Sequence, residues 1–232
     1  MTHYKAGSIL LVLIAGVVSF GLSGCRNSGN THDFFGSDSD GQDSSGTVRI
    51  AKMGGDIDVK EAPHGADLST MGGNIHVGDV ASFAKVKSMG GVITIDHAKG
   101  SIDAKTMGGE INVGHAEGSL KASTMGGDIT ARMVGTSAEK RDVDLTSHGG
   151  TVTLTVPKDF PMEVRISLAY TRNAPRTYEI IDHIGLEQRE SSDWDMSNGS
   201  PRKYIRAMGH VGTGLNHVVI STVNGDVILK QE

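Results

Sequence analysis

Two histidines of this chain, His97 and His115, have the residue type and spacing of metal ligands. They occupy the same position in two successive units of a sequence repeat. They would therefore stack in neighbouring layers of the fold, with Asp79 and Asp96 nearby in the same alignment. Imidazole and carboxylate groups together can bind Zn²⁺ or Cu²⁺. A ladder of solvated turns explains the same residues, and we favour it. We therefore predict neither a metal site nor a cofactor.

Five methionines recur with the same period and could bind a soft metal through their thioethers. They are Met53, Met71, Met89, Met107 and Met125. Thioether ligands select Cu(I), but later repeats place His148 and Val223 in the same slot. A methionine beside a tight turn is also a flexible apolar filler. We therefore predict that these side chains fill a corner of the fold.

No constellation of catalytic residues stands out in the sequence. One outward position of the repeat carries a mixed set of side chains, namely Asp56, Asn74, Val92, Glu110 and Asp128. Another alternates in charge, through Asp67, Lys85, Asp103 and Lys121. Opposite charges on neighbouring strands stabilise a sheet by about 0.2–1 kcal/mol per pair, which is reason enough for them. We predict that the chain is not an enzyme; a glycan-active β-helical lyase or hydrolase, which works with clustered carboxylates, is the alternative.

The elements that position these residues belong to an 18-residue repeat. Each repeat contains Met-Gly-Gly, usually preceded by Ser or Thr, and apolar and polar residues alternate on both sides of it. This alternation predicts strands with one buried face. A fixed, short period of this kind predicts a solenoid, in which stacked repeats share one core. We therefore predict an all-β fold, a parallel β-helix with two strands and a short third side in each coil.

The glycine pairs of the repeat are predicted to turn the chain sharply in every layer. Glycine reaches positive φ without steric cost, so it suits a turn that recurs in each coil. The ten residues are Gly54, Gly55, Gly72, Gly73, Gly90, Gly91, Gly108, Gly109, Gly126 and Gly127. A small apolar residue nine positions after each methionine is predicted to point inward at the next corner. These residues are Ala62, Val80, Ala98, Ala116 and Val134.

The repeat continues with irregularities in the C-terminal half. The segment Thr146–Leu154 fits the repeat after a longer interval than the earlier units, which predicts an insertion of five residues near Thr136–Asp142. The segment Ser221–Leu229 matches the repeat again. Between them lie the alternating segment Met162–Tyr170 and the only tryptophan, Trp194. We predict that any singular site lies at the insertion or around Trp194, because identical layers leave little that is singular.

Residues 1–25 are predicted to be a signal segment. The apolar run Ile9–Phe20 is shorter than the ~20 residues that a membrane-spanning helix needs. It leads to Leu22, Ser23, Gly24 and Cys25, which resemble the lipobox of bacterial lipoproteins. The resemblance implies cleavage before Cys25, acylation of its thiol and attachment to a membrane. Because Arg26 and not Asp follows, it implies the outer membrane where the organism has one, and otherwise the outer face of the plasma membrane.

The predicted organisation of the chain has four parts. The signal segment covers residues 1–25, a flexible tether 26–46, regular coils 47–156, and less regular β coils or an antiparallel cap 157–232. The tether is rich in Ser, Gly, Asn and Asp, and it buries too little apolar surface to offset its ordering entropy.

The composition restricts the partners and the means of stabilisation. Cys25 is the only cysteine, so the domain must be held by its core without an internal disulfide. The formal net charge is −5, from 22 basic and 27 acidic residues. A mildly acidic chain without a basic block argues against nucleic acid as a partner.

The repeats resemble a known family. Residues 124–129, Thr-Met-Gly-Gly-Asp-Ile, and 222–230, Thr-Val-Asn-Gly-Asp-Val-Ile-Leu-Lys, resemble the bacterial adhesin-like family of β-helical domains, the domain of unknown function 4097 type. The resemblance covers about residues 47–231. It implies a right-handed, single-stranded parallel β-helix, often on envelope-anchored proteins, and supplies no catalytic residue. We predict a non-enzymatic envelope lipoprotein, an adhesin-like binding or scaffold module for an envelope protein or polysaccharide; a sensor or regulatory partner in envelope stress is an alternative.

Overall fold

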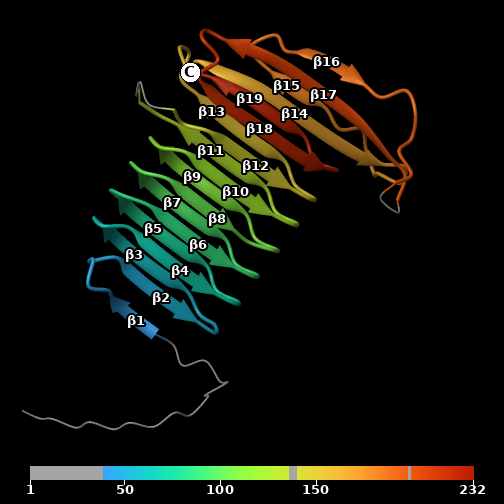
Figure 1. Ribbon diagram of the computed structural model, residues 1–232. Coiled ribbons are helices and arrows are strands. Elements are labelled where there is room, and N and C mark those ends of the chain that lie inside the picture. Colours follow the sequence, from blue (N-terminus) through green and yellow to red (C-terminus); the bar gives the residue numbers. More distant parts are fainter. Residues whose placement is uncertain (1–38, 136–139, 198–199) are drawn as a thin grey trace, which may run out of the picture. The chain divides into compact units, whose positions relative to one another are not determined.

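The structure, a computed structural model, describes residues 39–135, 140–197 and 200–232, whose regular structure is β-strand throughout (Figure 1). These residues belong to the unit Gly36–Glu232, and the unit Met1–Phe35 lies outside them. The strands form two sheets. The first sheet has eleven strands in the order β1-β2-β4-β6-β8-β10-β12-β18-β14-β17-β16, and the second has eight in the order β15-β19-β13-β11-β9-β7-β5-β3.

The strand bounds follow the repeat. The first sheet contains β1 (Ser39–Gln42), β2 (Val48–Lys52), β4 (Ala66–Thr70), β6 (Ala84–Ser88), β8 (Ile102–Lys105), β10 (Leu120–Thr124), β12 (Val143–Ser147), β14 (Met162–Thr171), β16 (Glu187–Glu190), β17 (Arg202–Val211) and β18 (Asn216–Val223). The second sheet contains β3 (Ile57–Ala62), β5 (Ile75–Val80), β7 (Ile93–Ala98), β9 (Ile111–Ala116), β11 (Ile129–Met133), β13 (Val152–Val156), β15 (Ile180–Asp182) and β19 (Val227–Gln231).

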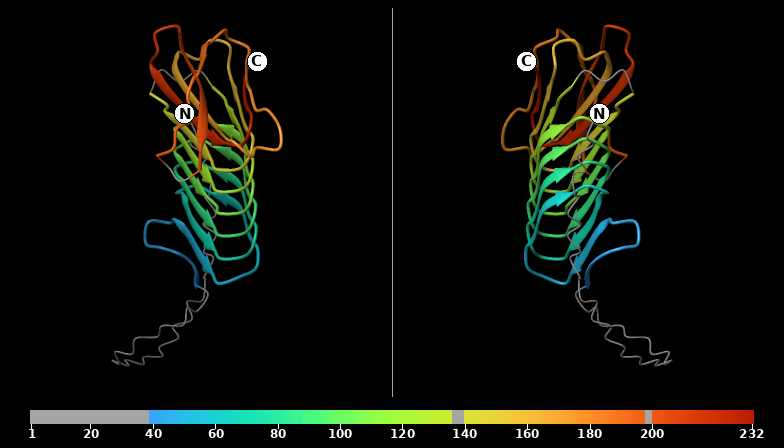
Figure 2. Two further views of the ribbon diagram at one scale, coloured as in Figure 1. Left: turned by 90° about the vertical axis from the view of Figure 1, so that its right-hand side faces the viewer. Right: turned by 90° about the vertical axis from the view of Figure 1, so that its left-hand side faces the viewer.

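Each regular coil contributes one strand to each sheet, and equivalent residues of neighbouring coils pair in parallel. Val48 pairs with Ala66 in the first sheet, and Ile57 with Ile75 in the second. Figure 2 shows the stack from two opposite sides, with each coil passing from one sheet to the other. The register advances by one repeat from each coil to the next, which confirms the predicted parallel β-helix.

The core lies between the two sheets. The isoleucines four positions after each methionine form one buried column, as the alternation predicts; they are Ile57, Ile75, Ile93, Ile111 and Ile129. The predicted third apolar position is also buried in four coils, at Ala62, Val80, Ala98 and Ala116. The prediction is wrong at Val134, which is half-buried. The register of β11 shifts after Ala131, so that Met133 pairs with Ala116 and takes the buried place.

In the first sheet, the corners after β4, β6, β8, β10, β12 and β18 are each held by a buried hydroxyl. The side-chain oxygen of the Ser or Thr that precedes each methionine slot donates to the carbonyl oxygen of a glycine in the neighbouring coil. The bonds are Thr70 to Gly55 (3.2 Å), Ser88 to Gly73 (3.1 Å), Thr106 to Gly91 (3.0 Å), Thr124 to Gly109 (2.9 Å), Ser147 to Gly127 (2.9 Å) and Thr222 to Gly150 (2.8 Å). In five of these coils the same oxygen accepts the N–H of the second glycine of its own coil. Each hydroxyl therefore joins two coils.

The glycine pairs are required for a reason other than the predicted one. The chain bends at each pair as predicted, but among the ten glycines only Gly55 has a positive φ, of 82°, so positive φ is not the general reason for them. Instead, from Gly73 on, the second glycine of each pair lies directly on the backbone of the preceding coil. A Cβ at these positions would lie 1.9–2.1 Å from a glycine carbonyl oxygen; they are Gly73, Gly91, Gly109 and Gly127, with Gly150 and Gly225 in the later coils. The stacking distance, not the dihedral angle, selects glycine.

The methionine column does not fill the corner, and that prediction is wrong. Met53, Met71, Met89, Met107 and Met125 are between 48% and 57% exposed. The preceding hydroxyl points inward and occupies the corner, so the alternation of the strand turns the methionine to the outside. The five side chains form one column on the surface.

The segment predicted to be a tether is partly ordered. Residues 39–42 form β1, which pairs antiparallel with β2. A turn follows in which the Asp43 carboxylate accepts the backbone N–H groups of Ser45 and Thr47. A hydrogen bond from the Ser45 hydroxyl lowers the pKa of Asp43, and the Arg49 ion pair acts in the same direction. These contacts offset the ordering entropy that the composition alone does not.

The insertion lies where the sequence predicts it. Leu120 pairs with Val143, so the coil between them is longer than the regular coils below it. Residues 136–139 lie outside the described residues. C-terminal to the insertion, the stack contains both predicted kinds of structure. Like a further coil, β14 pairs in parallel with β18, and β15 pairs in parallel with β19. The strands β17 and β16 extend the first sheet in antiparallel pairing.

The order of the last coils departs from the order of the sequence. The strands β18 and β19 insert between earlier ones: β18 lies between β12 and β14, and β19 between β13 and β15 (Figure 1). The chain reaches this place by crossing the start of β14. There the buried Asn216 side chain donates to the carbonyl oxygen of Pro161 (2.8 Å) and accepts the backbone N–H of Arg141 (2.7 Å). The C-terminal coil is thus clamped on both sides.

We expect Gly109→Ala to lower the free energy of unfolding by about 3 kcal/mol or more, because its Cβ would lie 2.0 Å from the Gly91 carbonyl oxygen and the backbone cannot move away without breaking the stack. Gly108→Ala is a matched control in the same turn, since the nearest atom lies at 3.9 Å. It should change the stability by less than about 1 kcal/mol. Urea unfolding followed by circular dichroism measures both, and equal effects would contradict the close-approach explanation.

Candidate functional site

The outer face of the second sheet carries a ladder of histidines and carboxylates. His76 lies between two acidic residues of the adjacent coils, with Nδ1 3.1 Å from Asp58 Oδ1 and Nε2 3.0 Å from Asp96 Oδ2. The hydrogen bond with Asp58, and to a smaller extent that with Asp96, raises the pKa of His76 above its ordinary value of 6.5. The His76 side chain therefore links three successive coils.

The predicted metal candidates lie in the same ladder. His97 Nδ1 lies 3.3 Å from Asp79, and Nε2 lies 2.8 Å from Glu117 Oε1. The His115 ring stands edge-on to that of His97, with centroids 6.2 Å apart. Asp96 pairs with His76 and not with either of them. Within the described part of the chain, no group of three or more His, Cys, Asp or Glu residues is placed to hold a metal ion.

The charges of the first sheet are also paired with one another. The predicted column aligns Asp67, Lys85, Asp103 and Lys121 in register. Ion pairs join Lys85 to Asp67 (3.5 Å) and Lys121 to Asp144 (3.3 Å). Each is solvent-exposed and contributes at most about 1 kcal/mol. On both repeating faces, part of the charge is therefore paired between neighbouring coils.

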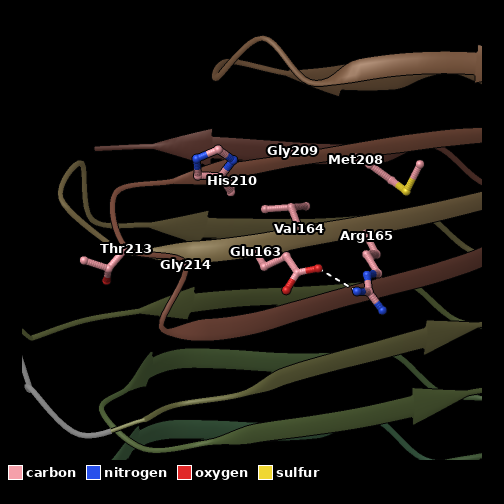
Figure 3. A pocket seen from close by; sticks show the side chains of 8 residues that line it. All are labelled: Glu163, Val164, Arg165, Met208, Gly209, His210, Thr213 and Gly214. Atoms are coloured by element: carbon pink, nitrogen blue, oxygen red, sulfur yellow. Dashed lines mark hydrogen bonds and ion pairs between the residues drawn. The ribbon is translucent and has the colours of Figure 1, made fainter.

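The strands β14, β17 and β16 form the non-repeating extension of the first sheet. A hollow of about 540 Å³ lies on β14 and β17 of this extension. Figure 3 shows Glu163 and Arg165 beside one another on β14, with His210 and Met208 on the neighbouring strand β17. The Arg165 Nη2 donates to Glu163 Oε1 (2.6 Å), and His217 of β18 lies 3.8 Å from the same carboxylate. A carboxylate, a guanidinium and the imidazole of His210 thus line one open hollow, a set of groups that can bind a polar ligand of mixed charge.

An aromatic cluster lies near the C-terminal end of β14. Trp194 packs edge-on against Tyr170, with ring centroids 5.9 Å apart. The cations of Arg172 and Lys203 lie 5.8 and 5.6 Å from the Trp194 ring, within the range of cation–π attraction. The Tyr170 hydroxyl donates to Glu190, which raises the pKa of Tyr170 to about 12. The region around Trp194 is therefore singular in structure, as the break in the repeat suggests.

The described end of the insertion is organised by Arg141. Its side chain is 3% exposed and donates to the carbonyl oxygens of Val134 (2.8 Å) and Gly135 (3.3 Å). The guanidinium also lies over the Phe160 ring, at 4.9 Å. Burial lowers the pKa of Arg141. Sequence reasoning missed this residue and its partner Asn216, because their contact spans 75 residues and no local pattern signals it.

Two further observations concern the N-terminal part and membranes. Leu22, Ser23, Gly24 and Cys25 lie outside the described residues. In the part that the structure describes, no helix has the length and the hydropathy to cross a membrane.

A comparison with protein families identifies the family of this chain. The family model described as Toastrack DUF4097 matches residues 16–181, more than half of the chain. The chain belongs to the Toastrack family. The match ends within β15, so β16 to β19, including the inserted coil, lie outside it. No curated protein and no solved structure matches this Toastrack chain.

We expect His76→Gln to remove a pH-dependent part of the stability. Because the folded-state pKa of His76 is raised, its ion pairs stabilise fully below pH 6.5 and are lost as the pH rises through that raised pKa. The difference from the parent should reach about 0.2–1 kcal/mol near pH 6 and vanish at high pH. Urea unfolding between pH 5.5 and 9 measures it. The exposed His183, replaced by Gln, serves as the control, and an equal profile for both variants would refute the assignment.

Proposed function

We propose that this Toastrack protein is an exported, lipid-anchored, non-enzymatic binding module that holds an envelope protein or polysaccharide at the non-repeating C-terminal face. The observation that carries the proposal is the contrast between the two kinds of surface. On the repeating faces, His76, His97 and Lys85 are paired with carboxylates of adjacent coils. The hollow around Glu163 and Arg165 and the cluster around Trp194 break the repeat.

The arrangement of the strands supports such a presenting role. The described chain begins with β1, and β14 lies eight strand positions away in the first sheet. At ~4.8 Å per strand this separates the two by roughly 38 Å. A stack that is locked at every corner acts as a rigid spacer, so a ligand bound at β14 and β17 is held at a fixed distance from the start of the domain. This face on β14 and β17 would serve either adhesion or the sensing of envelope stress.

The anchor is tested by labelling. We expect cells that express the full chain to incorporate a palmitate analogue into it, because acylation of the Cys25 thiol is the chemistry that the lipobox resemblance implies. Cys25→Ala should abolish the label and release the protein from the membrane fraction, since fewer than two acyl chains hold a protein only marginally. Ser23→Ala keeps a small residue in the lipobox and should retain the label. Label on Cys25→Ala would refute the anchor.

The binding face is tested by cross-linking and capture of the full chain from cell envelopes. We expect Arg165→Glu with His210→Glu to reduce the captured partner about fivefold, the effect of roughly 1 kcal/mol, because the first change reverses a charge at the hollow and the second adds a negative charge there. The matched control is Lys60→Glu with His115→Glu, exposed positions on the repeating second sheet.

Two results would count against this proposal. One is an equal loss of capture in the control, which would place binding on the repeating face. The other is turnover of an envelope glycan by the purified protein that Glu163→Gln abolishes, which would make the chain a glycan-active enzyme.

A further inference from the structure

The exposed methionine column has no structural task that other residues could not perform. His148 and Val223 occupy the same slot in later coils, and the corner hydroxyls of those coils, Ser147 and Thr222, make the same bonds to glycine carbonyl oxygens. The backbone therefore stacks in the same way without a methionine. Most large apolar side chains of the described residues are buried, whereas the methionines of this column are about half exposed. The side chains from Met71 to Met125 are therefore accessible to a ligand.

The register places neighbouring methionines one strand spacing apart. The preceding residues pair coil to coil, Thr70 with Ser88 and Thr124 with Ser147. The carbonyl oxygens of Met71, Met89 and Met107 lie 3.8–3.9 Å from the Cβ position of the first glycine in the next coil. Successive Cα atoms are thus separated by the ~4.8 Å of paired strands. With metal–sulfur bonds of about 2.3 Å, the length found for zinc and thiolate, an ion held between two sulfurs in line needs them about 4.6 Å apart.

The column continues into a nitrogen ligand. Ser147 pairs with Thr124, so His148 follows Met125 in the column. Its backbone N–H donates to the Thr124 carbonyl oxygen (3.2 Å), and its side chain is exposed. Thioethers select Cu(I), and imidazole is also a good ligand for copper. Two thioethers and one imidazole therefore stand in adjacent coils at this end of the column.

The surrounding charges restrict the kind of ion. Met71, Met89 and Met107 line a hollow of about 370 Å³ together with Lys52, Lys87 and Lys105. Lys105 also forms an ion pair with Asp103 (3.2 Å). These ammonium groups oppose a divalent cation more strongly than a monovalent one. Lys87 and Lys105 stand two residues before Met89 and Met107, whereas Ser123 stands two residues before Met125. The electrostatic repulsion of a bound cation is therefore weaker at the end of the column near His148.

We propose that the column from Met71 to Met125, with His148 at its end, binds Cu(I), and that the tightest site lies between Met107, Met125 and His148. Each ion is held by side chains of adjacent coils, and no electron transfer is involved. The site stands on the outer surface at the corner after the first sheet and is separate from the binding face around Glu163. It does not depend on the function proposed above.

The test is competition for Cu(I) with a colorimetric chelator in the absence of oxygen. The full-length chain is used with Cys25→Ser, because a free thiol would itself bind copper. We expect this parent to take up at least one equivalent of Cu(I). Met107→Leu with Met125→Leu should weaken the affinity about tenfold or more, since leucine keeps the size and apolar character but removes the sulfur. His148→Gln should weaken it at the same site.

The matched control is Met196→Leu, at an exposed methionine outside the column. It should bind Cu(I) as the parent does, and all variants should unfold at the same urea concentration as the parent. The proposal is overturned if the parent does not bind Cu(I), if the Met107 and Met125 double variant binds as tightly as the parent, or if the control loses as much affinity as that double variant.

Discussion

The fold depends on one contact, in which a glycine of each coil rests directly on the carbonyl group of the glycine beneath it. A side chain at Gly109 would place its Cβ 2.0 Å from the Gly91 oxygen, so the coils could not approach to strand-pairing distance. The Thr106 hydroxyl closes the same corner by donating to that oxygen. Sterics sets the spacing and the hydroxyl satisfies the carbonyl group, which would otherwise be buried without a partner. The Ile column and the surface ladders follow from the register that this contact imposes.

The sequence predicts the repeating part of the fold well, because its information is periodic. The constant interval of the repeat and the alternation around Ile93 identify the parallel coils, and the longer interval before Val143 identifies the insertion. The role predicted for the methionines is wrong, and the glycines stand at the predicted turns for a different reason, because a single-sequence pattern shows where a turn recurs but not which side chain faces inward. The strands β14 to β17 have no periodic partner. The passage from β17 into β18 depends on contacts such as Asn216 with Arg141, which no local pattern encodes.

For the candidate site residues too, the sequence predicts the periodic placement but not the individual contacts. The sequence brings His97 and His115 into neighbouring coils, and the structure places them there with their rings edge-on. The sequence gives no sign that both ring nitrogens of His97 are hydrogen-bonded to carboxylates from the coils on either side. Trp194 stands out in the sequence only as a break in the pattern. Its neighbours Tyr170 and Lys203 come from β14 and β17, and no local pattern places them beside it. Membership of the Toastrack family gives the architecture alone.

The insertion of β18 and β19 between older neighbours has a consequence for synthesis and for the lengthening of the domain. The ribosome makes β14 and β15 before the strands that separate them from β12 and β13, so this part of the stack cannot close until β18 and β19 have emerged. A chain that stops before them leaves two unpaired edges in each sheet, which are prone to proteolysis and aggregation. Duplication of coils can therefore lengthen the domain only on the N-terminal side of this closure. The C-terminal end has a fixed design, whereas the number of regular coils is free to vary.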